Sequence, residues 1–201
     1  MSPPASRRAE VRTSGHEPED SALVARALAG ESGADEALFR RHAPAVLSTA
    51  LRLLRNRAEA EDVVQETFIV ALTSLRRLRD PAAVGGWLIQ IAVRRAHRRF
   101  RRQRMLRVLG FATPPDDVRL EDLARPGTAP VERAELALVD RALDGLASED
   151  RVAWILRHVE GHLLAEVAQL TGCSLATAKR RLARAEAVVR AHVSPTEPDD
   201  A

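Results

Sequence analysis

Residues 162–190 carry two helical patterns separated by a tight turn, and no other segment constrains the fold as strongly. An apolar run ends just before Gly172, which tolerates the positive φ that a tight turn needs. Ser174 follows where a helix N-cap is expected, since its hydroxyl can accept a backbone N–H of the next turn. Apolar residues then recur at spacings of three and four, as on one buried helical face. The pattern predicts a helix-turn-helix whose second helix buries Leu175, Ala178, Leu182, Ala185 and Val189.

The other face of that second helix is polar, with small and basic side chains. Such a face suits the major groove of DNA, where arginine can bind guanine through two hydrogen bonds. The alternative is an amphipathic helix with a solvated basic face. The preceding helix, the glycine turn and the cap favour DNA binding. The candidate DNA-contacting residues are Ser174, Thr177, Lys179, Arg180, Arg181, Ala183 and Arg184.

The composition favours an all-α protein. Only 3% of the 201 residues are aromatic and none is tyrosine, whereas strands favour aromatic and β-branched residues. A single cysteine, Cys173, excludes an intramolecular disulfide and a cysteine-based metal cluster. No apolar run reaches the length of a membrane span, and the N-terminal stretch lacks the apolar core of a secretory signal. We therefore expect a cytoplasmic protein.

The helical patterns form two groups, separated by a proline-rich stretch that excludes a long helix. Two small helical domains, an N-terminal bundle and a C-terminal helix-turn-helix domain, are therefore expected. The predicted divisions are residues 1–19 (a disordered tail), 20–108 (the bundle), 109–131 (a flexible linker), 132–193 (the helix-turn-helix domain) and 194–201 (a tail).

Periodicity, caps and breakers also predict the individual helices. Asp20 or Ser21 is expected to cap the first, and Pro44 to kink or delay the second. The third is expected to bury Leu72 among other apolar residues, and Ser148 to cap a later helix. The predicted helices cover residues 21–30, 34–55, 58–78, a segment from about 87 onward, 132–146, 148–158, and the two of the helix-turn-helix.

An arginine-rich block continues the helix expected to begin near Trp87. Its apolar stripe fades beyond Ala96, and residues 81–115 include no acidic residue. A helix that is basic on all sides cannot be buried, so it is either a solvent-exposed extension or a phosphate-binding face. Without acids nearby in the sequence, DNA backbone is the favoured ligand, with salt-dependent affinity. The candidate residues are Arg94, Arg95, Arg98, Arg99, Arg101 and Arg102.

A polar stripe is expected on the helix over residues 58–78, opposite Val64 and Leu75. It contains an isoleucine among acids and a glutamine, and periodicity leaves open whether it is solvated or contacts a basic partner helix. Its residues are Asp62, Gln65, Glu66 and Ile69.

Catalytic signals are weak. The sequence has no glycine-rich phosphate loop, nucleophile elbow or His-Glu zinc motif. His158 and His162 have metal-capable spacing, but no third ligand is evident nearby. We expect no cofactor, no metal, no small-molecule substrate and no enzymatic activity. A metal-dependent enzyme that uses the acidic helix or these histidines is a remaining alternative.

Three segments taken in order resemble extracytoplasmic-function (ECF) sigma factors of bacterial RNA polymerase. They are AEAEDVVQETFIVAL (58–72), WLIQIAVRRAHRRFRR (87–102) and TAKRRLARAE (177–186). The resemblance extends over residues 21–192 and implies a protein that directs core polymerase to promoters. Asp62, Gln65 and Glu66 match family positions that contact a coiled coil of the polymerase β′ subunit.

The resemblance also implies roles for the two predicted domains. The first would be a region 2-like domain that binds polymerase and opens the −10 element. Opening would include flipping a base out of the DNA stack, which costs free energy. The second would be a region 4-like domain that recognises the −35 element through Lys179, Arg180, Ala183 and Arg184. The implied partners are core polymerase (β′ and β subunits), promoter DNA and an anti-sigma factor. A stand-alone helix-turn-helix regulator that does not bind polymerase is the alternative.

The departures from the family pattern include two arginines of the basic block. Arg94 stands where the family usually has asparagine, and Arg98 where it often has aspartate. The resemblance therefore does not specify the −10 sequence preference.

Overall fold

A computed structural model describes residues 19–111, 118–119, 121–123 and 129–193. These residues form helices and turns without any strand, which confirms the all-α prediction. The expected tails, apart from Glu19, and most of the expected linker lie outside the described residues. Within the described part, no helix combines the length and hydropathy that crossing a membrane requires.

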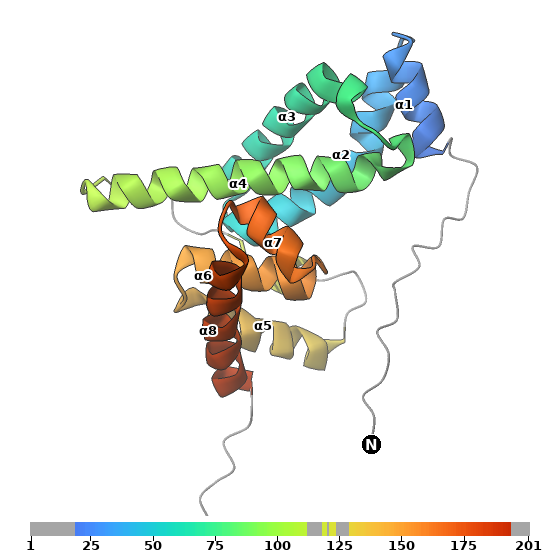
Figure 1. The fold of residues 1–201 in the computed structure, drawn as a ribbon. Helices are drawn as coiled ribbons and strands as arrows, with labels where there is room; N and C mark the ends of the chain where they lie inside the picture. The colour runs from blue at the N-terminus through green and yellow to red at the C-terminus, as the bar shows by residue number, and fades with distance from the viewer. Residues whose placement is uncertain (1–18, 112–117, 120, 124–128, 194–201) are drawn as a thin grey trace, which may run out of the picture.

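The N-terminal group contains four α-helices, and α2, α3 and α4 pack against one another (Figure 1). Two short 3-10 turns connect α3 to α4, and α4 projects at its C-terminal end beyond the rest of the molecule. The bounds are α1 (Asp20–Leu28), α2 (Ala34–Leu54), α3 (Arg57–Ser74), η1 (Leu75–Arg77), η2 (Pro81–Ala83) and α4 (Val84–Val108).

Local caps explain where α3 and the segment before α4 begin. The side-chain oxygen of Asn56 accepts a hydrogen bond from the backbone N–H of Glu59, at 3.0 Å. Asp80 does the same for the backbone N–H of Ala82, at 3.0 Å, with Pro81 at the first position of η2. Capping of this kind satisfies backbone donors that a helix start leaves without partners.

Three predictions about the N-terminal helices were wrong. Neither Asp20 nor Ser21 caps α1, because the Asp20 carboxylate lies against Arg41 and His42 of α2, at 2.9 and 3.1 Å. The fourth helix begins at Val84 rather than near Trp87, because the Asp80–Pro81 turn leads directly into it. Leu72 is 36% exposed and does not belong to the core.

Pro44 does not delay the second helix, which runs from Ala34 to Leu54 with the proline inside it. The ring lies on the exposed side of the helix.

The C-terminal group packs its last helix, α8, against α5 and α6. Its elements are α5 (Pro130–Asp144), α6 (Ser148–Trp154), η4 (Ile155–Val159), α7 (Leu164–Thr171) and α8 (Leu175–Val193). The helix predicted over residues 148–158 is thus continued by a π-helical turn, and Ser148 lies inside α6 without capping it. In the predicted stripe of α8, Ala178 and Ala185 are buried and Leu182 and Val189 are half-buried, whereas Leu175, at the start of the helix, is 54% exposed.

The two groups of helices lie directly against each other, α4 packing on α7 and α6. Arg55, buried at the end of α2, donates hydrogen bonds to Asp140 (2.7 Å) and Asp144 of α5. Glu160 accepts hydrogen bonds from Thr49 (3.0 Å) and Arg52 (2.9 Å). Buried apolar residues of both groups form one continuous cluster. The chain thus adopts a closed arrangement that periodicity did not predict.

Candidate nucleic-acid interface

The helix-turn-helix has the local geometry that its sequence predicts. Gly172 ends α7 with a φ of 64°, in the left-handed region that favours glycine. The Ser174 hydroxyl accepts a hydrogen bond from the backbone N–H of Thr177, at 3.2 Å, which confirms the predicted N-cap of α8. The turn therefore sets the direction in which α8 leaves α7.

Most of the predicted DNA-contacting residues of α8 share an exposed surface. Ser174, Lys179, Arg180, Ala183 and Arg184 are exposed and Thr177 is half-buried. The predicted set thus forms a polar face of one helix, with one exception described below.

Arg184 is held by a carboxylate that sequence reasoning missed. Its guanidinium donates hydrogen bonds to both oxygens of Asp150, at 2.8 and 2.7 Å. These hydrogen bonds and the Asp150 charge raise the pKa of Arg184. Asp150 is buried in the first turn of α6, where the positive end of the helix dipole favours its charge. Since the arginine side chain itself remains 59% exposed, the pair orients its guanidinium at the surface.

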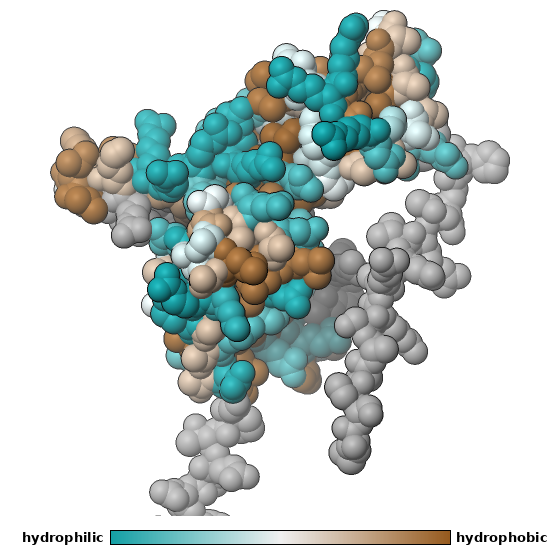
Figure 2. Space-filling model, in the orientation of Figure 1, coloured by the Kyte–Doolittle hydropathy of each residue, from teal (hydrophilic) through white to brown (hydrophobic). Residues whose placement is uncertain are grey.

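The arginine-rich block begins near the middle of α4 and continues toward its C-terminal end. Arg94, Arg98, Arg101 and Arg102 are exposed, and Figure 2 shows hydrophilic residues along most of the helix. Its projecting end is apolar in the same view and includes the exposed side chains of Met105 and Val108.

The predicted polar stripe lies on the exposed side of α3. Asp62, Gln65 and Ile69 are exposed, the last at 66%, and Glu66 is half-buried. The structure therefore brings all four predicted stripe residues together on one face.

The expectation that no acid neutralises the arginine block was wrong, because α3 packs its acids against α4. Arg99 donates hydrogen bonds to Glu66 (2.7 Å) and Asp62 (3.2 Å), and Arg95 to Glu66 (3.2 Å). Burial tends to lower the pKa of Arg99, but the hydrogen bonds and charges of Glu66 and Asp62 outweigh it and raise the pKa. The acids are far from the block in sequence and adjacent only in the fold.

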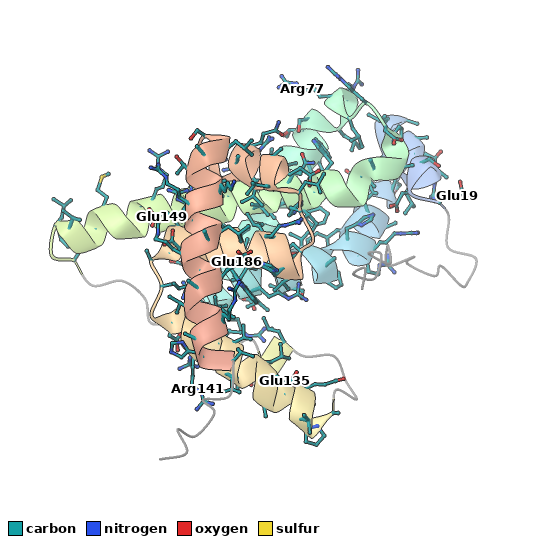
Figure 3. All side chains as sticks on the ribbon, turned by 60° about the horizontal axis from the view of Figure 1, so that its bottom comes forward. Glu19, Arg77, Glu135, Arg141, Glu149 and Glu186 are labelled. Atoms are coloured by element: carbon teal, nitrogen blue, oxygen red, sulfur yellow. The ribbon has the colours of Figure 1, made fainter. Side chains whose placement is uncertain are left out.

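A cleft of about 880 Å³ separates α4 from the helix-turn-helix. Arg181 lines it, so this residue faces α4 rather than the exposed face of α8. His97 lines the opposite wall, and its pKa is lowered first by burial and then by the charges of Arg181 and Arg101. Glu149, labelled in Figure 3 at the start of α6, also lines the cleft and opposes this lowering.

The two histidines with metal-capable spacing have different partners. His158 Nε2 lies 3.1 Å from Glu186, which Figure 3 labels on α8, and His162 Nδ1 lies 3.6 Å from Glu166. Among the described residues, no group of three or more His, Cys, Asp or Glu side chains is arranged to hold a metal ion. Cys173 is a free thiol, 3.3 Å from the Thr171 hydroxyl in the turn.

A helix-turn-helix with an exposed basic face, a separate arginine-rich helix and an exposed acidic stripe are features suited to a helical protein that binds DNA and a protein partner. The sequence matches the family described as Sigma-70 region 2 over residues 38–105 and the family described as Sigma-70, region 4 over residues 136–187. The chain belongs to the ECF family of RNA polymerase sigma factors.

Relatives and solved structures agree with this assignment. The ECF sigma factor SigM of Mycobacterium tuberculosis is 34% identical over 174 residues, which cover 86% of this chain and 83% of SigM. CarQ of Myxococcus xanthus, an RNA polymerase sigma factor, is 34% identical over 77% of this chain and 86% of its own. The structure of CnrH in complex with the cytosolic domain of CnrY is similar with a TM-score of 0.53 and 25% identity, over 87% of this chain and 96% of CnrH.

Proposed function

We propose that this chain directs core RNA polymerase to specific promoters by reading two DNA elements with two separate helices. The main support for this proposal is the order along the chain of the three candidate surfaces. The acidic stripe and the arginine-rich helix lie within the region 2 match, and the helix-turn-helix lies within the region 4 match. The family match over residues 38–105 disfavours a stand-alone helix-turn-helix regulator, which would not need that region.

The proposed polymerase-binding residues are those of the polar stripe on α3. Their exposure and acidic character suit a basic helical partner, and the resemblance points to the coiled coil of the β′ subunit. Ile69 adds an exposed apolar side chain that such a contact would bury. The proposed set is Asp62, Gln65, Glu66 and Ile69.

The proposed −10 surface is the arginine-rich face of α4. Its guanidinium groups would contact phosphates and position the duplex, while melting exposes bases for capture. The proposed residues are Arg94, Arg95, Arg98, Arg99, Arg101 and Arg102.

The proposed −35 surface is the exposed face of α8. Arg184, oriented by Asp150, is the best placed for a base contact, and the Ser174 turn is suited to a phosphate contact. Arg181 would join this surface only when the cleft between α4 and α8 opens. The proposed residues are Ser174, Thr177, Lys179, Arg180, Arg181, Ala183 and Arg184.

Function on a promoter requires the closed arrangement to open. The −35 and −10 elements are centred about 25 base pairs apart, or about 85 Å of duplex at ~3.4 Å per base pair. The helix α4, at 25 residues, is only about 37 Å long, and α8 lies across a single cleft from it. Residues 20–108 and 132–193 would therefore act as separate domains, with residues 109–131 as the linker between them.

The further partners follow from the family. An anti-sigma factor is proposed as a regulator, as the resemblance to the family implies. CnrH was likewise solved in complex with another protein, the cytosolic domain of CnrY. Action with polymerase and promoter DNA implies a cytoplasmic location and a factor that is not itself an enzyme.

The test is run-off transcription with core polymerase on a pool of genomic fragments. Specific transcripts that require the chain are expected, and their start sites would reveal the promoter. A chain that binds DNA fragments but yields no specific transcript with core polymerase would contradict the proposal.

A further inference from the structure

The two surfaces proposed to bind polymerase and the −10 element are each other's counterions. Both oxygens of Glu66 are engaged, one by Arg99 at 2.7 Å and the other by Arg95 at 3.2 Å. Asp62 accepts a second hydrogen bond from Arg99, at 3.2 Å. Every one of these four residues belongs to one proposed surface and is bound to the other.

The spacing of the residues makes this pairing a property of two helical faces. Asp62 and Glu66 are four residues apart on α3, and Arg95 and Arg99 are four apart on α4, so each pair lies on one face of its helix. Together with Arg98 and Arg102, three of these residues line a surface concavity of about 160 Å³.

The cluster also contains hydrogen-bond donors that the two carboxylates do not engage. Within the described part of the chain, Arg98 and Arg102 make no ion pair, and the buried Nε of Arg95 has no hydrogen-bond partner. The cluster thus contains four guanidinium groups and two carboxylates, and only Arg95 and Arg99 are paired with them. An anionic ligand fits the cluster, but a DNA phosphate that approached Arg95 or Arg99 would meet the repulsion of Glu66 and Asp62.

We infer that polymerase binding and −10 binding are coupled through competition for these charges, an inference that rests on the proposed function. A basic partner that takes up Asp62 and Glu66 releases Arg95 and Arg99 for DNA phosphate. By linkage, DNA phosphate on those arginines releases the carboxylates for the partner, so each ligand strengthens the other. In the free chain the acids hold the DNA affinity of α4 down.

The test measures DNA binding by the full chain without polymerase. A labelled short duplex of arbitrary sequence is titrated by fluorescence anisotropy over a series of KCl concentrations, with the Asp62→Asn/Glu66→Gln double variant. Removing both charges is expected to tighten binding about two- to fivefold, because exposed ion pairs of this kind contribute modestly. The plot of log affinity against log salt should steepen by about one counterion as arginines become available.

Glu61→Gln is the matched control. It removes one carboxylate from the same helix, but Glu61 pairs with Arg57 of α3 itself, at 3.4 Å, and with none of the α4 arginines whose side chains the structure describes. Its effect on DNA affinity should be under about twofold, as for a general change in net charge. A double variant that binds no more tightly than expected from this control would overturn the inference.

A second test introduces Arg99→Gln into both the natural chain and the Asp62→Asn/Glu66→Gln double variant and compares the two losses of DNA affinity. In the natural chain this change should cost little DNA affinity, since Glu66 and Asp62 already occupy the guanidinium. In the double variant it should cost more, because Arg99 is then free to bind phosphate. Equal losses in both backgrounds would overturn the coupling.

Polymerase affinity separates failure of the inference from failure of the proposed function. The double variant should bind core polymerase more weakly than Glu61→Gln. Tighter DNA binding with unchanged polymerase affinity would overturn the polymerase site, and the coupling with it. Weaker polymerase binding without tighter DNA binding would overturn the coupling alone.

Discussion

The two candidate DNA-binding helices, α4 and α8, orient their arginines in different ways. On α8, Arg184 rests on Asp150, a buried carboxylate of the C-terminal scaffold. On α4, Arg95 and Arg99 rest on Glu66 and Asp62, which are exposed enough to bind another protein. An arginine paired with a buried carboxylate is oriented toward DNA whatever else the protein binds. The availability to DNA of an arginine paired with an exposed carboxylate depends on what else that carboxylate binds. We therefore expect the DNA affinity of α8 to be independent of the protein partner, and that of α4 to depend on it. In this sense α8 is a fixed reader of DNA and α4 a conditional one.

The largest expected effect concerns the contact that holds the two regions together. In Arg55→Met, Asp140 would lose the buried guanidinium that neutralises it, and breaking a buried pair in this way costs about 3–5 kcal/mol. We expect the closed arrangement to open, since opening returns Asp140 to water. Small-angle scattering should show a larger radius of gyration. Arg57→Met, on an arginine that is 62% exposed, is the control and should leave the radius unchanged.

The stripe on α3 gives the next largest effect. Glu66→Arg or Asp62→Arg should weaken binding to core polymerase by roughly 100-fold, because like charges at a contact cost several kcal/mol. The isolated −35 interaction of α8 should be unaffected, which would sharpen the contrast between the two regions. Binding can be measured by competition with a labelled sigma factor. The proposed polymerase site is wrong if Glu61→Arg is equally harmful.

A smaller effect is expected for the fixed reader. Arg184→Ala should weaken binding to a −35 sequence by about tenfold and relax the preference at one base pair, the loss typical of a bidentate base contact. The comparison needs binding to a set of single-base variants of the −35 element. Arg190→Ala, further along α8, is the control. Uniform weakening on all sequences would mean that Arg184 contacts phosphate instead.

The smallest effect is on pH. Burial and the charges of Arg181 and Arg101 lower the pKa of His97, so the closed arrangement favours neutral histidine. The contribution of neutral His97 to the closed arrangement is fully present above the ordinary histidine pKa of about 6.5. It is lost as the pH falls through the lowered pKa, because the histidine then becomes charged. Scattering from pH 8 to pH 5 should show slight opening, which His97→Gln should remove. If His97→Gln opened with pH in the same way as the natural chain, His97 would not be the group responsible for the opening.

Asp144 acts in a separate pH range. Burial tends to raise its pKa, but the hydrogen bond from Arg119 and the charge of Arg55 outweigh this and lower the pKa. Its contribution is therefore present above the ordinary aspartate range near pH 4 and is lost only below it. Opening caused by His97 can thus be observed before Asp144 is protonated.

Sequence patterns predicted the helices of the site well because local forces set them. The Gly172 turn, the Ser174 cap and the stripe that begins at Ala178 depend on residues within a few positions of one another. Errors occurred where a distant residue competed with a local one. Asp20 binds Arg41 and His42 instead of capping α1, and no pattern within α1 records those partners.

By itself, the sequence determined the all-helical class, the order of the three candidate segments and most of the residues that each face exposes. These properties follow from helical periodicity, turn chemistry and capping, which act along the chain. Only the tertiary structure decided which charges neutralise which. Glu66 lies 33 positions from Arg99, and Asp150 lies 34 positions from Arg184. An ion pair depends on distance in space, and packing between helices sets that distance.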